Sequence, residues 1–353
     1  MDEIDFKNGA KIDTRPAEEK AKDFKLEELV ASAAPVAWKE KERAKWRTFP
    51  DQQQDGSGSC VAQTAKKLAG INLWLKEGTY VEFSATPLYA ARSNRPEGGM
   101  IGVEAFEIWR KDGMTLEALV SSKNMSDAAM DSAKVEQYEK DIAKVFCLSN
   151  HVGLPTGDID IVASTIQQTG KGVMTWFYFT NAEWSPEVPV IKEALALNSS
   201  KALRHSVTAV DFFLYQGKKA LLIEDSAHFG GRTRRIVTED FFKARNWYAR
   251  YGTTFKFQEG AGTVKPKHTF LRDLAFSEIF FTDTEVAALQ DCLKYDGSFP
   301  ANADSTGYYG AVTAKAVMAF QRKYAVASEA EIISLQGRKV GPKTRAVLNE
   351  LFA

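Results

Sequence analysis

The stretch QQQDGSGSCVAQTAKKLAG, residues 52–70, decides the fold of this chain. A polar, glycine-rich segment ends at Cys60, and apolar residues then recur at helical spacing from Val61 to Ala69. This spacing predicts a helix over 61–76 with Cys60 at its N-terminus. Taken alone, such a cysteine is more often a small buried residue. A helix N-terminus also lowers the pKa of a thiol, however, and so favours the nucleophilic thiolate.

An activated thiol also needs an imidazole, and the chain has four histidines: His151, His205, His228 and His268. His205 opens a strand-like run in ALRHSVTAVDFFLYQGKKALLIEDSAHFGG, residues 202–231. A turn at Gln216-Gly217 would fold this segment into a hairpin and bring Asp225 back beside His205. Cys, His and a carboxylate form a set suited to acyl transfer. We expect His228 at a surface or rim, and His151 and His268 in solvated loops.

Residues 35–257 resemble the papain family of cysteine peptidases. In that family a Gln lies six residues before the nucleophile in Q-G-S-C-G-S-C-W, and here Gln54 precedes Gly-Ser-Cys60 in the same way. PVAWKEK resembles the start of the mature domain, and RPEGGMIGVEAFEIWRKDGM resembles the Gly-Gly segment and helix of the substrate site. HSVTAVDFF and LLIEDSAHFGG resemble the strands of the catalytic His and of the third catalytic residue.

The resemblance implies a role for each matching residue. Cys60 would attack the scissile carbonyl, and His205 would form the ion pair and protonate the leaving amine. Gln54 and the Cys60 backbone N–H would hold the oxyanion. Asp225 would orient His205. No metal or cofactor is implied.

The resemblance also implies a substrate site. Gly98 and Gly99 would pair with the backbone of an extended peptide, because the missing side chains allow close approach. Arg204 and Ala227 would contact the substrate.

The chain departs from the family pattern near the nucleophile and near the third catalytic residue. Ser57 replaces a disulfide cysteine and Val61 replaces a Trp. Asp225 stands where the family usually has Asn, and its charge is expected to raise the pKa of His205. Ala227-His228 replaces a Trp-Gly that shields this hydrogen bond. We therefore expect water to reach the His205–Asp225 pair and to lower catalytic efficiency.

The order of the predicted elements indicates an α+β domain with a helical half and an antiparallel β half. Helices are predicted over 61–76, 101–112, 127–146 and 159–169, and strands over 173–179, 206–215, 219–224 and 234–238. An N-terminal arm, residues 1–34 with a short helix over 17–32, precedes this domain. Residues 1–34 either inhibit this domain by lying across its cleft or tether it to a partner.

A second, smaller unit follows a Gly/Pro/Lys-rich linker at 258–268. Residues 269–353 indicate a small all-α domain of about three helices. Gly310-x-x-Thr313 and Gly341-x-x-Thr344 each begin an apolar helical pattern, and the Thr hydroxyls are expected to bind unpaired N–H groups of the first turn. Residues 285–352 resemble the peptidoglycan-binding type 1 domain, with a long loop at 327–338. The alternative is a docking bundle that binds other virion proteins.

Composition bounds the remaining possibilities. Lys+Arg and Asp+Glu both number 46, so broad binding to nucleic acid is not expected. No apolar run is long enough for a membrane span, and the charged N-terminus lacks the apolar core of a Sec signal. Three widely spaced cysteines indicate no disulfide framework, and Cys147 and Cys292 are expected in the core.

These features favour a peptidase made in the cytoplasm and associated with a bacteriophage virion or released by lysis. A cytoplasmic peptidase and an inactive structural virion protein are the alternatives.

Overall fold

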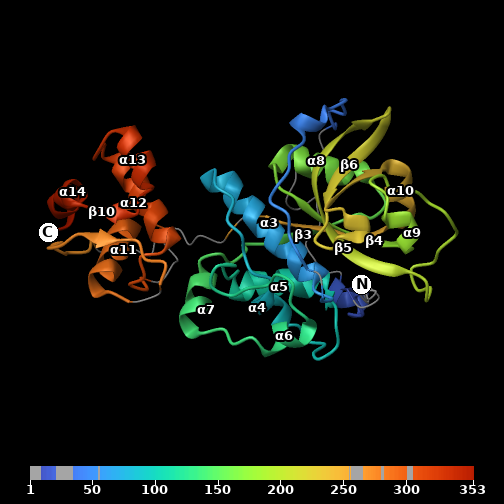
Figure 1. Cartoon of the computed structure of the whole chain (residues 1–353), viewed down its shortest axis with the longest axis horizontal. Coiled ribbons are helices and arrows are strands. Elements are labelled where there is room, and N and C mark those ends of the chain that lie inside the picture. Colours follow the sequence, from blue (N-terminus) through green and yellow to red (C-terminus); the bar gives the residue numbers. More distant parts are fainter. Residues whose placement is uncertain are drawn as a thin grey trace. The chain divides into compact units, whose positions relative to one another are not determined.

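A computed structural model of the chain describes residues 9–20, 35–54, 56–253, 255, 265–279, 282–299 and 305–353 (Figure 1). The chain divides into two compact units, residues 1–136 with 146–256 and residues 137–145 with 257–353. The sequence assigns 137–145 to the first domain, whereas the structure groups it with the second unit. None of the helices in the described ranges is long and apolar enough to cross a bilayer.

The helical half of the first unit surrounds α3 (Cys60–Glu77), an 18-residue helix that begins at the predicted nucleophile. The apolar residues between Val61 and Ala69 are all buried, so the helix predicted from them is confirmed. The shorter helices of this half are α4 (Thr86–Ala90), α5 (Gly102–Asp112) and α6 (Asp127–Ser132). A Cβ at Gly102 would lie 2.6 Å from the Trp176 ring, so only glycine lets α5 start this close to the sheet.

The β half is a six-stranded antiparallel sheet in the order β3-β8-β4-β5-β6-β7. Its strands are β3 (His151–Leu154), β4 (Val173–Phe179), β5 (Leu203–Tyr215), β6 (Lys218–Glu224), β7 (Arg234–Thr238) and β8 (Asn246–Gly252). The predicted strands at 173–179 and 234–238 match β4 and β7. β5 begins at Leu203 rather than at Ser206, so His205 lies within the strand.

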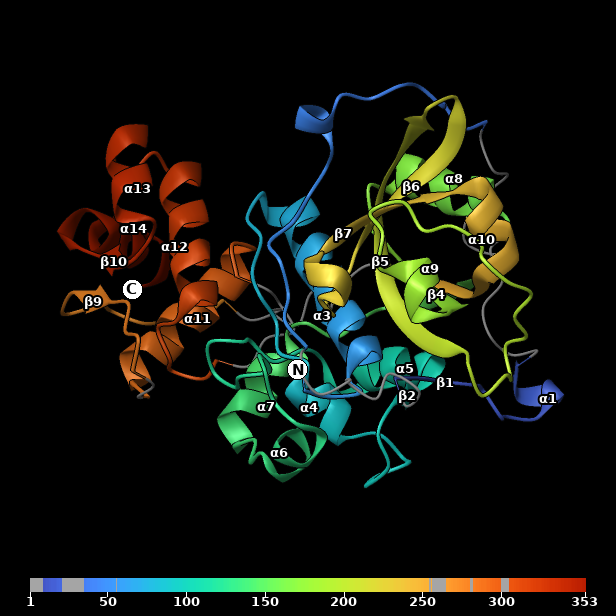
Figure 2. The ribbon, with the colours of Figure 1, turned by 45° about the vertical axis from the view of Figure 1, so that its right-hand side comes forward.

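The two faces of the sheet pack against different helices, as Figure 2 shows. On one face, Val207 and Ala209 of β5 share a core with α8 (Ile159–Thr169) and α10 (Glu239–Arg245). On the other face, Val210 and Phe213 pack with Ile71 of α3. A bulge between Ala209 and Asp211 shifts the alternation of β5, which is why Phe213 lies on the α3 side.

The helix predicted over 127–146 is wrong as a single element. The structure has α6 and then α7 (Gln137–Lys144), with Ala133 in extended backbone between them. The Ser132 hydroxyl donates to the Ala129 carbonyl, a local bond of the kind that competes with helix continuation. The fourth predicted helix, over 159–169, coincides with α8.

His151 does not lie in a solvated loop, as the sequence suggested. It is buried on β3, where Nε2 lies 2.7 Å from a Glu107 carboxylate oxygen and Nδ1 contacts the Arg250 guanidinium. Because a guanidinium only donates, Nδ1 accepts and Nε2 carries the proton. Glu107 and Arg250 thus explain how this imidazole is tolerated inside the protein.

The second unit contains α11 (Thr284–Asp296), α12 (Ala311–Lys323), α13 (Glu329–Leu335) and α14 (Pro342–Phe352), with the short antiparallel pair β9 (Leu274–Ala275) and β10 (Lys339–Val340). The expected loop at 327–338 is wrong, because it contains α13. Ser328 caps that helix by accepting from the Glu331 N–H at 3.3 Å. Cys292 is fully buried in α11, as expected for a core residue.

The two Gly-x-x-Thr motifs of the second unit have the same structure. The Gln290 amide donates to Thr313 Oγ1 at 2.8 Å, and the Gln321 amide donates to Thr344 Oγ1 at 3.0 Å. Each Gln also donates to the carbonyl two residues before the motif's glycine. The Thr hydroxyls therefore bind glutamine side chains rather than the helix N–H groups predicted for them.

Six short elements lie in the remaining described segments: β1 (Ala10–Lys11), α1 (Ala17–Lys20), η2 (Arg43–Lys45), β2 (Met100–Ile101), α9 (Asn181–Trp184) and η3 (Phe229–Gly231). Only the first turn of the helix predicted over 17–32 and the end of the predicted linker lie within the described residues. In that linker end, the His268 N–H donates to the Phe352 carbonyl, and its half-buried ring packs against Phe270. His268 is thus part of the second unit rather than a solvated residue.

Candidate active site

Cys60 is the first residue of α3, and its side chain is fully buried. The loop before it is held by side chains rather than by a capping bond from Ser59. The Gly58 N–H donates to the Asp127 carboxylate at 2.8 Å, and the Ser57 and Ser59 hydroxyls lie 2.7 Å apart. The thiol therefore lies at the positive end of a long helix, directly after a loop whose geometry is fixed by these bonds.

The β5–β6 hairpin brings His205 and Asp225 together, as the sequence predicted. Its turn residues Gln216 and Gly217 have φ of 51° and 75°, the left-handed conformation that a two-residue hairpin turn requires. His205 Nε2 lies 2.7 Å from Asp225 Oδ1, and both side chains are fully buried. Nδ1 is the ring nitrogen that remains for the Cys60 thiol.

The charges of this site favour a protonated His205. Burial lowers the pKa of the imidazole, but the Asp225 carboxylate and the Cys60 thiol outweigh it and raise the pKa to about 9. Burial also opposes ionisation of Asp225, and the neighbouring His205 and Arg235 reverse this, so the pKa of that carboxyl lies below its ordinary value. The site is thus arranged to hold an imidazolium beside a carboxylate and a thiol.

The expectation that water reaches the His205–Asp225 pair is wrong. Ala227 leaves no opening, because the Trp184 indole donates to Asp225 Oδ2 at 2.9 Å and is itself fully buried. The Phe229 ring packs edge-on against His205, with centroids 5.7 Å apart. Trp184 comes from α9, so an aromatic from another part of the chain takes the shielding position.

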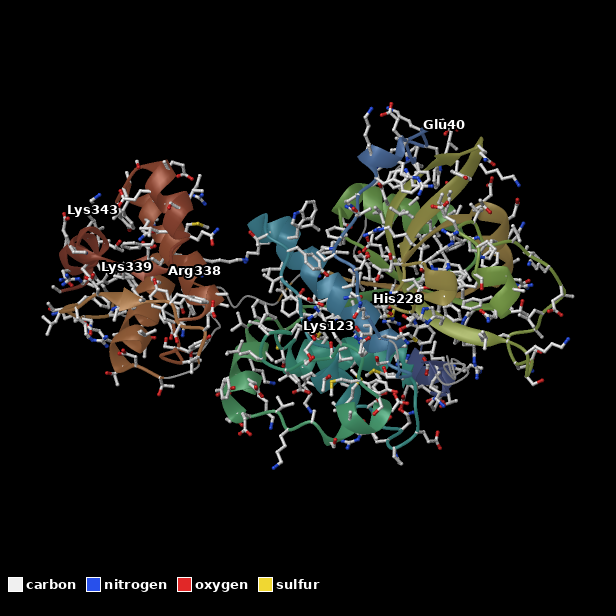
Figure 3. The ribbon with its side chains drawn as sticks, viewed as in Figure 1. Glu40, Lys123, His228, Arg338, Lys339 and Lys343 are labelled. Atoms are coloured by element: carbon white, nitrogen blue, oxygen red, sulfur yellow. The ribbon has the colours of Figure 1, made fainter. Side chains whose placement is uncertain are left out.

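Ala227 and His228 follow Asp225 and have different positions. The Ala227 N–H donates to Asp225 Oδ1 at 2.9 Å, and its side chain is buried. His228 is half-buried at the start of η3 (Phe229–Gly231), which agrees with the expected rim position (Figure 3). Arg204 is half-buried on β5, opposite Tyr178 of β4. The substrate roles of Arg204 and Ala227 stay predictions.

Gln54 is oriented by its neighbours so that its amide nitrogen faces the nucleophile loop. Its Oε1 accepts from the Ser226 hydroxyl at 2.6 Å, and its Nε2 donates to the Ser57 carbonyl at 3.2 Å. Only one of the two amide hydrogens is used in that bond. The other is the donor that the oxyanion role requires.

Replacing Gln54 by alanine is expected to lower kcat by about 10²–10³, the scale for loss of one oxyanion donor. The measurement is kcat and KM on a peptide substrate, with the melting temperature as a check on folding. Gln53→Ala is the matched control, because this exposed neighbour contacts Asn124 instead. Equal losses in the two variants would contradict the role of Gln54.

The Gly98–Gly99 segment is tied to the nucleophile loop by two side chains that the sequence did not single out. The Gly99 N–H donates to the Tyr89 hydroxyl at 2.8 Å, and that hydroxyl donates to Asp127 Oδ1 at 2.9 Å. The same Asp127 oxygen accepts from Gly58. One carboxylate therefore positions both the loop before Cys60 and the predicted substrate-binding glycines.

The N-terminal arm pairs with the strand that follows these glycines. Ala10 and Lys11 of β1 lie parallel to Met100 and Ile101, which form β2, and the Met100 N–H donates to the Gly9 carbonyl at 3.0 Å. Ala10 is fully buried, and β1 also contacts β5, the strand of His205. The backbone edge beside Gly98–Gly99 is thus already occupied by the protein's own chain.

Comparisons with known proteins support the fold of both units. The structure resembles xylellain, a cysteine protease from Xylella fastidiosa, with a TM-score of 0.54 and 14% identity over 71% of this chain and 97% of that one. It also resembles the Amb a 11 cysteine protease of ragweed pollen in its proform (TM-score 0.47, 15% identity, 64% of this chain and 67% of that one). A third likeness is digestive procathepsin L 3 of Tenebrio molitor (TM-score 0.45, 14% identity, 63% and 76%).

The family comparison concerns the second unit. Residues 282–327 match the model of a putative peptidoglycan binding domain, which covers α11 and α12. No curated protein matches the sequence. Within the described residues, no group of three His, Cys, Asp or Glu side chains is arranged to hold a metal ion.

Proposed function

We propose that this chain, a papain-like fold joined to a peptidoglycan-binding-like unit, is a cysteine peptidase. The observation that carries the proposal is the buried array in which His205 interacts with both Cys60 and Asp225. A thiol at a helix N-terminus, an imidazole of raised pKa and an oriented amide donor are the groups that acyl transfer needs.

In this reaction the Cys60 thiolate attacks the scissile carbonyl carbon and forms a tetrahedral intermediate. Gln54 Nε2 and the Cys60 backbone N–H stabilise its oxyanion. The His205 imidazolium then protonates the leaving amine, which departs and leaves a thioester on Cys60. Neutral His205 next takes a proton from water, the hydroxide attacks the thioester, and the thiolate is regenerated. Asp225 keeps the ring oriented throughout.

The N-terminal arm is expected to reduce this activity when β1 is paired with β2. A segment that occupies the substrate edge most of the time reduces apparent affinity in proportion to the fraction of open protein. A variant without residues 1–34 is therefore expected to show at least a tenfold higher kcat/KM on unfolded casein or a peptide mixture. The same deletion combined with Cys60→Ala is the control for contaminating proteases.

The runner-up function is a structural or docking protein that keeps the papain-like fold. This reading requires that both the full chain and the variant without residues 1–34 are inactive. It also requires that iodoacetamide labels Cys60 no faster than the buried Cys147 and Cys292. Selective labelling of Cys60 would support the peptidase instead, because an activated thiol reacts faster than an ordinary buried thiol.

The second unit is proposed to bind peptidoglycan and to hold the peptidase at the cell wall. The support is the family match over 282–327 together with the helices found there. The full chain is expected to co-sediment with purified sacculi, whereas a chain that ends at residue 256 is expected to stay in solution. Equal sedimentation of the two, or none from sacculi of several bacterial classes, would favour a docking bundle. Association with a phage particle, or release by lysis, stays a prediction from the sequence.

A further inference from the structure

Arg235 lies beneath the candidate catalytic pair and uses its guanidinium in three directions. It belongs to β7, and its side chain is fully buried. Nη1 donates to Asp225 Oδ2 at 2.6 Å, Nε donates to the Trp184 carbonyl at 2.7 Å, and Nη2 donates to the Phe229 carbonyl at 2.8 Å. Arg235 therefore connects the carboxylate with Trp184, which donates to it, and with Phe229, which packs against His205. The single ammonium of a lysine lacks this planar fork.

The strand pair β6–β7 places two carboxylates beside two arginines in alternating directions. Glu224 is the last residue of β6 and Asp225 follows it, whereas Arg234 and Arg235 are the first two residues of β7. Arg234 lies 3.4 Å from Glu224, which is also bound by Lys67 of α3. Because successive side chains of a strand point to opposite faces, only Arg235 reaches the Asp225 side. Arg234 is thus a built-in control with the same charge and a neighbouring carboxylate.

The Asp225 carboxylate accepts hydrogen bonds from four donors, two at each oxygen. His205 Nε2 and the Ala227 N–H bind Oδ1, whereas the Trp184 indole and Arg235 bind Oδ2. Arg235 thereby fixes the rotation of the carboxylate, with Oδ1 facing the imidazole. It is also a full positive charge beside a full negative charge, in a region without solvent exposure.

We propose that Arg235 is a positioning residue of this site, and that its guanidinium fixes the Asp225 carboxylate and offsets part of its charge, so that the carboxylate acts on His205 as an oriented acceptor of weakened charge. The inference rests on the proposed function, since it assigns a role in the same reaction. It also explains how a carboxylate serves where the papain pattern has an uncharged amide. Without Arg235, the imidazolium would be held too strongly to release its proton readily to the leaving group.

The groups that act on this pair come from every element packed around it. Cys60 at the start of α3 and Asp225 after β6 raise the pKa of His205. His205 and Arg235 lower the pKa of Asp225, and the neighbouring Arg232 lowers the pKa of Arg235. From α9 the neutral Trp184 indole reaches the carboxylate, whereas the adjacent Glu183 is paired with Arg245.

The experiment measures the titration of the His205 ring directly, by NMR of the Cε1–H signals of the full chain, together with kcat and KM against pH. The variants are Arg235→Gln, Arg235→Lys, Asp225→Asn and Asp225→Asn/Arg235→Gln, with Arg234→Gln as the matched control. The ring titration does not depend on a known substrate. Failure of the proposed peptidase function therefore leaves this readout intact.

Arg235→Gln is expected to raise the His205 midpoint by about one unit, because the charge of Asp225 is no longer offset. Its kcat is expected to fall by about 10–100-fold with KM little changed. Arg235→Lys should keep the midpoint and lose about tenfold in kcat, since the charge stays and the fork is lost. The double variant should titrate below the wild type and be more active than Asp225→Asn alone, in which the guanidinium is unpaired.

An unchanged midpoint in Arg235→Gln, or an equal shift in Arg234→Gln, would overturn the proposal. If Arg235→Gln does not fold, Arg235→Lys and the double variant decide the outcome. A double variant no more active than Asp225→Asn, together with full activity of Arg235→Lys, would show that Arg235 is only a packing residue.

Discussion

Cys60→Ala is expected to abolish peptide hydrolysis, with a loss of about 10⁶ in kcat. This is the scale seen when the nucleophile of a serine peptidase is removed, and the residual rate comes from binding and the oxyanion donors. Cys60 is fully buried at the start of α3, and the change removes only a sulfur atom, so folding should be preserved. The measurement is kcat/KM of the variant without residues 1–34, compared with the same variant combined with Cys60→Ala.

Cys147→Ala and Cys292→Ala are the matched controls for this substitution. Both thiols are buried, and the pKa of Cys292 is raised by burial to about 12, opposite to activation. Each control should retain full activity. Residual hydrolysis in Cys60→Ala above about one part in a thousand would assign the nucleophile elsewhere.

Asp225→Ala is expected to cost about 10⁴ in kcat and about 3–5 kcal/mol in the free energy of unfolding. The activity loss follows from an imidazole that has lost its orienting carboxylate. The stability loss follows because the Arg235 guanidinium stays buried without its partner. Asp225→Asn keeps an acceptor for His205 and should retain part of the activity, with the alkaline limb of kcat/KM moved from about pH 9 to lower pH.

The same pair makes stability depend on pH in a defined direction. The His205 pKa is raised from 6.5 to about 9, so its contribution is complete below about pH 6.5 and is lost as the pH rises to about 9. The Asp225 pKa is lowered, so its contribution is present above the ordinary value of 3.8 and is lost in stronger acid. Urea unfolding at about pH 6, 7.5 and 9 measures the first effect, on the order of 3 kcal/mol.

Asp225→Asn is the control for this pH dependence. In this variant the free energy of unfolding should decline less steeply above pH 6.5, because the amide does not stabilise the imidazolium. Parallel stability curves for the two proteins would mean that the His205–Asp225 bond does not carry the effect.

The sequence was informative wherever a local pattern governs the structure. The β5–β6 hairpin follows from alternating apolar residues around Gln216-Gly217, and it alone places Asp225 beside His205. α3 and α8 follow from helical spacing of apolar residues. These are contacts within a strand pair or within a helix, where neighbours in sequence decide the conformation.

The parts that were missed depend on residues distant in sequence. Trp184 lies 41 positions from Asp225, and nothing in its local sequence says which polar group its indole will meet. His151 looked like a loop residue because β3 has four residues and its pairing partner β8 follows much later. The position of Arg235 has one local signal in the sequence. Arg234 and Arg235 begin a strand, and Glu224 and Asp225 lie at the end of the strand before it.

If peptide substrates bind beside Gly98–Gly99 as proposed, the parallel pairing of β1 with β2 would make the arm their intramolecular competitor. A tethered segment acts at an effective concentration on the order of millimolar, which dilution of the protein does not lower. A substrate peptide at micromolar concentration would therefore compete poorly, however well it fits the site. The onset of activity would be a unimolecular event, set by the rate at which residues 9–11 leave Met100 and Ile101. Cutting the arm, or pulling it toward another partner, would start hydrolysis without any change at Cys60.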